Sequence, residues 1–146
     1  MTTTADAAAG TTSASRPRRL AAPLAASAVL AAGTVYTALA DPYRAGFFPP
    51  CLFLAASGHW CPGCGGLRAV HELTHGDVNA ALGMNPVVVL LIVPAGVALL
   101  VAWLRTAWRG GRAPRIPLTL AIGIPVMLGV FWVLRNIPVL EPYLAP

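Results

Sequence analysis

Three long apolar stretches dominate the pattern of hydrophobic and polar positions along the chain, and none of them contains a charged side chain. They run over residues 20–40, 86–104 and 116–134. A helix of about 20 residues is about 30 Å long, which matches the hydrocarbon core of a bilayer. The pattern therefore predicts an all-α membrane protein with three transmembrane helices over these ranges.

The start of the second span carries its own helix signal. Asn85 is a favourable N-cap, and Pro86 follows it at the first helical position, where the missing N–H has no cost. Pro94 and Pro125 fall inside the second and third spans, which membrane helices tolerate better than soluble ones. Both observations favour transmembrane helices.

The first span admits two interpretations. The segment has the three parts of a cleavable secretory signal peptide. These are a basic start formed by arginines, an apolar core, and an A-x-A cleavage site, Ala38-Leu39-Ala40, before Asp41. The apolar run is longer than the core of a typical signal, and Pro23 stands near its start, which favours a retained transmembrane helix. Either interpretation predicts that the chain after Asp41 lies outside the cytoplasm.

The composition agrees with a membrane protein. Hydrophobic residues make up 57% of the 146 positions and charged residues only 10%, against roughly a quarter charged in an average soluble domain. Residues 1–15 are almost wholly Thr, Ala, Ser and Gly, so they have nothing with which to form a core. We expect residues 1–19 to be a disordered tail.

Arginine supplies all ten basic residues, and with five acids this gives a net charge of +5. One side of the predicted spans carries Arg16, Arg18, Arg19, Arg105, Arg109, Arg112 and Arg115, and the other carries Arg44, Arg68 and Arg135. An excess of basic residues is typical of cytoplasmic loops. We therefore expect a cytoplasmic N-terminus and a cytoplasmic basic loop over 105–115, with 41–85 and the 135–146 tail outside. Arginines in these places are typical topology signals, so no nucleic-acid partner is expected.

The segment from residue 41 to residue 85 concentrates the groups that carry chemistry. It holds all three cysteines, all three histidines and three of the five acids. In order these are Asp41, Cys51, His59, Cys61, Cys64, His71, Glu72, His75 and Asp77. Any specific function is therefore expected in this segment.

The sharpest motif is Cys61-Pro62-Gly63-Cys64-Gly65, a knuckle in which two sulfurs point at one centre from a tight turn. One knuckle supplies half of a tetrahedral zinc site. Residues 65–75 are predicted to form a helix ended by Gly76, with Arg68, His71 and His75 following Cys64 along one face. Cys51 with His71 or His75 would then complete a Cys₃His site, with zinc as the cofactor. Alternatively, each histidine simply lies on a solvated helix face.

Two other uses of the cysteines remain open. A C-x-x-C pair at a helix N-terminus is typical of thiol–disulfide exchange, with Cys61 and Cys64 as the redox pair. A plain disulfide that staples a small outer loop is the structural alternative. Attachment of a c-type haem is excluded, because Gly65 stands where histidine is required.

Downstream of the knuckle, the pattern predicts a short helical hairpin. Arg68 and Glu72 are spaced for a modest ion pair on the first helix, and Arg68 is a candidate for a lipid phosphate group. Asp77 is the expected N-cap of the second helix, and Asn85 caps the following span. The fold predicted is thus three transmembrane helices with a short Cys-rich helical hairpin between the first and the second.

A set of cysteine, glycine, proline and polar residues at characteristic spacings follows the first span. It comprises Cys51, Gly58, Cys61-Pro62-Gly63-Cys64-Gly65, Arg68-Ala69, Leu73, Gly76-Asp77, Ala81 and Asn85-Pro86. They resemble a family of small bacterial membrane proteins catalogued as domain of unknown function 2752. Its signature is a CPxCG knuckle, a threonine-arginine pair, a later Gly-Asp and an Asn-Pro that opens a transmembrane helix. The resemblance covers about residues 45–100. It implies a bacterial plasma-membrane protein and brings no established activity.

The sequence departs from this family in two places. Leu67 stands where threonine usually precedes the arginine, and Leu52 follows the first cysteine in place of a frequent proline. His71 does not match the family pattern, so the resemblance implies that a shared metal site uses the three cysteines. Its fourth ligand would be water, a carboxylate such as Asp77, or a group from a second protomer.

These observations favour a structural or accessory membrane protein over an enzyme. Besides the bilayer, the expected partners are another membrane protein or a second protomer. The alternatives are an extracytoplasmic thiol–disulfide oxidoreductase that uses Cys61 and Cys64, and a lipid- or partner-binding module anchored by Arg68.

Overall fold

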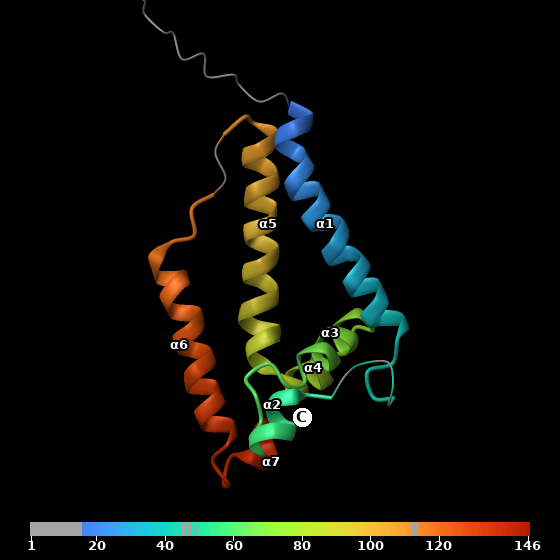
Figure 1. Ribbon diagram of the computed structural model, residues 1–146, viewed down its shortest axis with the longest axis vertical. Helices are drawn as coiled ribbons and strands as arrows, with labels where there is room; N and C mark the ends of the chain where they lie inside the picture. The colour runs from blue at the N-terminus through green and yellow to red at the C-terminus, as the bar shows by residue number, and fades with distance from the viewer. Residues whose placement is uncertain (1–15, 45, 47, 49, 112–113) are drawn as a thin grey trace, which may run out of the picture.

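The computed structural model describes residues 16–44, 46, 48, 50–111 and 114–146. All regular elements in this part of the chain are helices (Figure 1). The long helices are α1 (Arg16–Leu39), α5 (Val93–Trp108) and α6 (Leu118–Arg135), and the short ones are α2 (Leu52–Ser57), α3 (Gly66–Thr74), α4 (Val78–Met84) and α7 (Glu141–Leu144). The four short helices gather at one end of the long ones. We call this the cysteine end (residues 40–85 and 135–146).

Three helices are long and apolar enough to cross a membrane, as the hydrophobic pattern predicted. They span Arg16–Leu39, Val88–Trp108 and Leu118–Arg135, and large apolar side chains such as Leu30, Leu90 and Val126 are exposed along them. Exposed apolar surface of this extent requires an apolar surrounding. The predicted all-α fold with three transmembrane helices is therefore confirmed.

The first two long helices extend beyond the apolar runs that predicted them, whereas α6 begins at Leu118, two residues after the predicted start at residue 116. α1 begins at Arg16, so residues 16–19 are helical and the prediction of a disordered tail over 1–19 was wrong for them, while residues 1–15 lie outside the described chain. α5 continues to Trp108 and thus includes Arg105, which was predicted to lie in the loop. Arginine is a good helix former, so a membrane helix can continue past the apolar core.

A π-helical turn, η1 (Val88–Ile92), lies at the start of the second span, directly before α5. Pro94 follows it and has no N–H with which to bond the carbonyl of Leu90 four residues earlier. The wider π turn relieves the clash of the proline ring with that carbonyl. Pro94 therefore changes the winding of the helix without ending it.

The predicted hairpin between the first two spans is present as α3 and α4. The chain turns at Gly76, whose φ of +83° favours glycine. Asp77 then caps α4, because its Oδ1 accepts a hydrogen bond from the Ala80 N–H at 2.8 Å. The hairpin was predicted correctly because its turn and cap are local features of the sequence.

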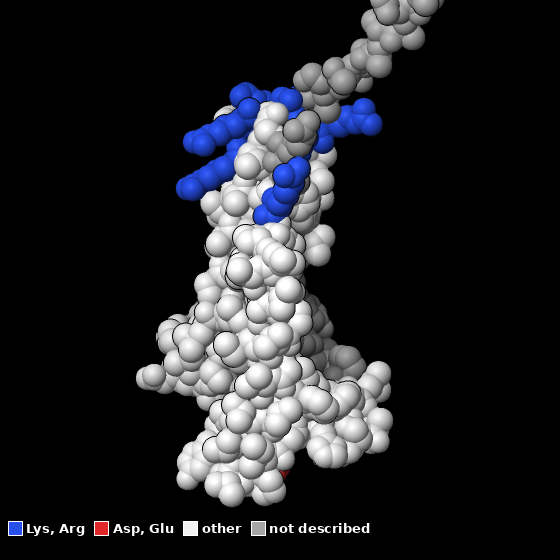
Figure 2. All heavy atoms as spheres, turned by 90° about the vertical axis from the view of Figure 1, so that its left-hand side faces the viewer, with Lys and Arg blue, Asp and Glu red and all other residues white. Residues whose placement is uncertain are grey.

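The long helices are fastened to each other unevenly. α1 packs against α5 and α3, whereas α6 contacts α7 at the cysteine end (Figure 1). The segment 135–146, which was expected to be a simple tail, folds back as α7 at the cysteine end. At the opposite end of the bundle, arginine side chains gather on the surface (Figure 2). We call this the arginine end (residues 16–19, 105–111 and 114–115).

Candidate metal centre

The knuckle is a tight backbone turn that requires glycine at its end. The Cys64 N–H donates to the Cys61 carbonyl at 3.2 Å, and the Gly66 N–H donates to the Gly63 carbonyl at 2.9 Å. Gly65 has a φ of +78°, and a Cβ on it would collide with the carbonyl oxygen of Met84 and with Pro146. Glycine here supplies both the turn and the close approach of three chain segments.

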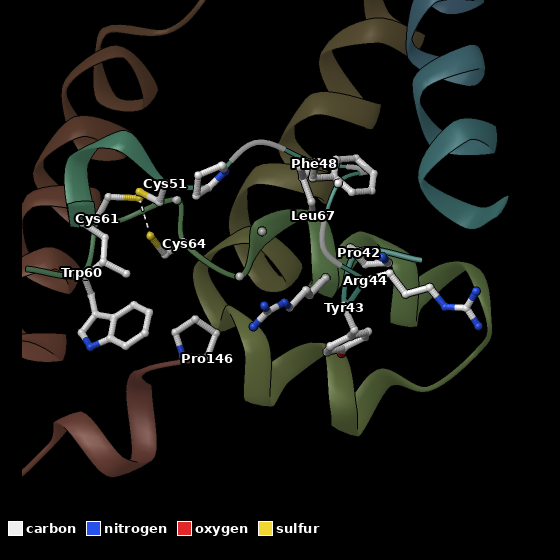
Figure 3. A pocket seen from close by; sticks show the side chains of 17 residues that line it. Pro42, Tyr43, Arg44, Phe48, Cys51, Trp60, Cys61, Cys64, Leu67 and Pro146 are labelled. Atoms are coloured by element: carbon white, nitrogen blue, oxygen red, sulfur yellow. Dashed lines mark hydrogen bonds between the residues drawn. The ribbon is translucent and has the colours of Figure 1, made fainter. Parts of the chain in front are cut away.

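The turn brings the three cysteine sulfurs together. Cys51 precedes α2, and its Sγ lies with those of Cys61 and Cys64 in a group whose members are all within 4.8 Å of one another. The Sγ atoms of Cys61 and Cys64 are 2.8 Å apart (Figure 3). Thiolates around a tetrahedral zinc ion are about 3.8 Å apart, given Zn–S bonds of about 2.3 Å. Shifts of about 1 Å between the sulfurs therefore suffice to hold the ion.

The three thiols differ in acidity because their surroundings differ. Burial, followed by hydrogen bonds to Cys61 and Cys51, raises the pKa of Cys64 to about 12. A backbone N–H of Leu54 hydrogen-bonds to the Cys51 sulfur and, with the Cys64 side chain, lowers the pKa of Cys51. Cys51 is thus the first of these two thiols to lose its proton.

Asn85 fastens the knuckle to the second span. Its Nδ2 donates to the carbonyls of Pro62 and Cys64, both at 3.0 Å, and its Oδ1 accepts from the Val88 N–H at 3.1 Å. The side chain is fully buried. The predicted cap is therefore present. The same side-chain amide also binds the cysteine turn, and the sequence pattern of a helix cap does not predict this second role.

Arg135, at the end of α6, reaches the knuckle from the third span. One guanidinium nitrogen, Nη1, donates to the carbonyls of Cys61 and Cys64 at 2.9 and 3.1 Å, and Nη2 donates to the Leu144 carbonyl at 2.9 Å. The residue is fully buried, its Nε has no partner, and its guanidinium lies 4.8 Å from the Phe131 ring centroid. No carboxylate pairs with it, because the only ion pair in the described chain joins Arg44 and Asp41.

The residue after Arg135 holds the chain just before the knuckle. Asn136 Oδ1 accepts from the Trp60 N–H at 2.9 Å, and its Nδ2 donates to the Trp60 carbonyl at the same distance. The Trp60 indole N–H in turn donates to Glu141 Oε1 at 3.0 Å. The cysteine site is therefore held by Asn85 at the start of the second span and by Arg135 and Asn136 at the end of the third.

The histidines lie apart from the cysteine cluster. His71 Nδ1 is 2.8 Å from the Thr37 carbonyl of α1, and the centroids of the His71 and His75 rings are 4.3 Å apart, with the ring planes tilted by 39°. His59 is exposed, with Nδ1 2.8 Å from the Ser57 carbonyl. Throughout the described residues, the one group of three or more metal-binding side chains contains cysteines alone. The structure thus does not bring His71 or His75 to the cysteines.

The expected ion pair between Arg68 and Glu72 is absent from the described chain. Instead the Glu72 carboxylate accepts the Tyr43 hydroxyl at 2.6 Å, and the Arg68 guanidinium lies 5.1 Å from the Tyr43 ring centroid. Tyr43 as a whole is exposed, but partial desolvation of its phenol and this hydrogen bond raise the pKa of Tyr43 to about 12. The prediction of this ion pair was wrong. It rested on the spacing of Arg68 and Glu72 along one helix, whereas in the fold Tyr43 contacts both side chains.

A pocket of about 700 Å³ opens beside the cluster. The three cysteines lie on one side of it, and Pro42, Tyr43 and Arg44 lie on the other (Figure 3). Arg68 also lines it and makes no hydrogen bond or ion pair in the part of the chain described. Asp77, another candidate ligand, caps α4 and does not line the pocket.

Comparison with known proteins supports the resemblance drawn from the knuckle. Residues 51–103 match the family model described as a protein of unknown function, DUF2752. The match covers the three cysteines, the hairpin and most of the second span, and it ends before Arg135 and Asn136. No curated protein and no solved structure matches the chain.

Proposed function

We propose that the chain is a structural or accessory membrane protein whose cysteine end is organised by a zinc ion, bound by the thiolates of Cys51, Cys61 and Cys64. The observation that carries this proposal is the buried Arg135 guanidinium, which has no carboxylate partner and bonds the backbone of two of these cysteines. The convergence of the three sulfurs supplies the ligands.

Charge balance supports a metal-bound cluster over neutral thiols. Burying a cation without an opposite charge is unfavourable by several kcal/mol, and carbonyl groups satisfy its N–H donors without neutralising it. A zinc ion with three thiolates carries one net negative charge, because two positive charges meet three negative ones. That charge matches the single positive charge of Arg135. Neutral thiols or a disulfide would leave the buried guanidinium uncompensated.

The fourth ligand position of such an ion is reached from the pocket. A tetrahedral zinc ion takes four ligands, and the cysteines supply three of them. Because all three cysteines line the pocket, water or a ligand in the pocket can complete the site. Arg68 lines the same pocket and favours an anionic donor.

The orientation proposed for this protein is a cytoplasmic N-terminus in the plasma membrane of a bacterium. Arginine side chains gather at the end where α1 begins and α5 ends (Figure 2), which supports this orientation through the excess of basic residues at cytoplasmic ends. After chelator treatment, a membrane-impermeant maleimide should label the cysteines in intact cells. Labelling only after lysis would reverse the orientation.

Elemental analysis of the purified chain in detergent tests the metal site. We expect about one zinc ion per chain, lost in each of the variants Cys51→Ser, Cys61→Ser and Cys64→Ser. His71→Ala and His75→Ala are the matched controls, because they remove imidazoles that lie away from the cluster. Both should retain the metal.

Two outcomes would contradict the zinc proposal. A wild-type chain without metal, whose Cys61 and Cys64 are joined by a disulfide, would favour the thiol–disulfide alternative. Loss of zinc in a histidine variant that is still folded would return histidine to the ligand set.

A further inference from the structure

A second pocket, of about 400 Å³, lies between α1 and α5 near the arginine end. It is lined by Leu20, Leu24, Leu104, Arg105, Trp108 and Arg109. These residues belong to two spans that pack against each other, so the pocket is bounded by membrane helices on both sides. It is separate from the cysteine end and independent of the zinc proposal.

The lining changes from apolar to charged along the helices. Leu20 and Leu24 continue into the apolar part of α1, and Leu104 lies beside them on α5. Arg105 and Trp108 lie in the last turn of α5, and Arg109 directly follows the helix as its C-cap. Tryptophan and arginine at a helix end are typical of the headgroup level of a bilayer. The apolar part of the pocket is therefore continuous with the hydrocarbon, and its mouth lies among headgroups.

The mouth of the pocket carries uncompensated positive charge. Arg105 and Arg109 are spaced four residues apart on one helix face, and Arg16 lies 4.5 Å from the centroid of the Trp108 ring. The acids of the described chain, Asp41, Glu72, Asp77 and Glu141, all lie at the cysteine end. The only ion pair among the described residues is also there.

Arg19 adds to this charge from the other helix. Its guanidinium lies next to the turn at Gly110, where a Cβ would come within 3.3 Å of Nη1, and its Nε is buried without a hydrogen-bond partner. α1 and α5 thus both direct arginines to the same end without supplying an acceptor for them. An acceptor from outside the chain fits this arrangement.

We propose that this pocket binds an anionic phospholipid. The phosphate group lies between Arg105 and Arg109, the glycerol region lies at Trp108, and an acyl chain follows the three leucines. A zwitterionic lipid carries its own ammonium group, which opposes the arginines, so the pocket selects lipids with a net negative charge.

Fluorescence quenching by brominated lipids tests this site. The full chain is reconstituted in phosphatidylcholine vesicles that contain phosphatidylglycerol, with bromine on one lipid or the other at equal mole fraction. The Trp108 signal is the difference between wild type and Trp108→Phe. We expect a roughly 30-fold preference of this signal for brominated phosphatidylglycerol, as two arginines near a bilayer surface provide.

Matched double variants separate a site from diffuse attraction. Arg105→Gln with Arg109→Gln should abolish the preference, whereas Arg18→Gln with Arg115→Gln, which remove the same charge outside the pocket lining, should keep it. Equal loss in both pairs, or no preference in wild type, would overturn the proposal. Release of the lipid by millimolar inorganic phosphate would do so too, because it would show a site for a free anion. Co-purifying lipid mass, measured by native mass spectrometry, gives a second readout on the same variants.

Discussion

Arginine occurs at both ends of the bundle, but the two ends use it in opposite ways. At the arginine end, Arg18, Arg105 and Arg109 are exposed and make no ion pair among the described residues. At the cysteine end, Arg135 is fully buried and donates to three backbone carbonyls. One residue type therefore positions a helix end at the membrane surface in one place and holds a folded site together in the other. Burial and partners distinguish these roles, and position along the chain does not.

The largest expected effect comes from removing the buried guanidinium. Arg135→Met eliminates three hydrogen bonds and the counter-charge of the proposed zinc thiolates, so it should destabilise the protein by roughly 3–5 kcal/mol and release the metal. Thermal unfolding in detergent, with elemental analysis, measures both changes.

Arg18→Met at the arginine end is the control for this comparison. Arg18 is exposed, so the substitution should change stability by no more than about 0.5 kcal/mol. Equal destabilisation by the two substitutions would remove the distinction between the ends.

A smaller but still large effect is expected at Asn85. Asn85→Ala leaves the carbonyls of Pro62 and Cys64 without this donor and the Val88 N–H without its cap, for a loss of about 2–4 kcal/mol. Asn79→Ala on the exposed side of α4 is the matched control and should be near neutral. Similar melting temperatures for the two variants would show that the Asn85 bonds do not hold the knuckle.

Two glycines with the same backbone conformation sharpen the comparison of the ends. Gly65 and Gly110 have φ values of +78° and +80°. A Cβ at Gly65 meets backbone of Met84, whereas one at Gly110 meets only the flexible Arg19 side chain. Gly65→Ala should therefore cost about 3 kcal/mol, and Gly110→Ala about 1 kcal/mol, in unfolding free energy. An equal loss would mean that backbone strain, and not contact at the knuckle, sets the cost at Gly65.

The smallest expected effect concerns Tyr43. Its pKa is raised from the ordinary 10.0 to about 12 by partial desolvation and by Glu72, so the contribution of this contact is present below pH 10 and is lost as the pH rises through about 12. Glu72→Gln should move the phenol pKa back toward 10.0. Ultraviolet titration of tyrosinate, with Tyr43→Phe to assign the signal, measures the shift. An unchanged titration in Glu72→Gln would contradict the hydrogen bond.

Local sequence features predicted the helices, caps and turns. Contacts between residues far apart in the sequence could not be predicted in this way. The apolar runs, the Asp77 cap and the turn at Gly76 depend on neighbours within a few residues, and the structure has them all. Arg135 was interpreted as a topology signal because it directly follows an apolar span. Its contact with Cys61 joins residues 74 positions apart. The spacing of apolar and polar residues along the chain does not indicate a contact over such a separation.

The candidate site shows the same limit in its choice of ligands. The convergence of Cys51 with the knuckle was predicted as one possible arrangement, and the structure brings the three sulfurs together. The helix face predicted from Cys64 to His75 pointed to histidine as a fourth ligand. In the fold, α3 turns His71 toward the Thr37 carbonyl of α1. Which neighbour a helix face meets depends on packing, which the sequence pattern does not contain.

The dependence of the cysteine end on Arg135 has a consequence for biosynthesis. The knuckle and its hairpin leave the ribosome early, but the arginine that closes them is added only with the end of the third span. Until that span has been made, the cysteine turn is without its last backbone contacts. The hydrogen bonds from Arg135 to the cysteine turn therefore form late in synthesis, and they can form only once the third span has been made.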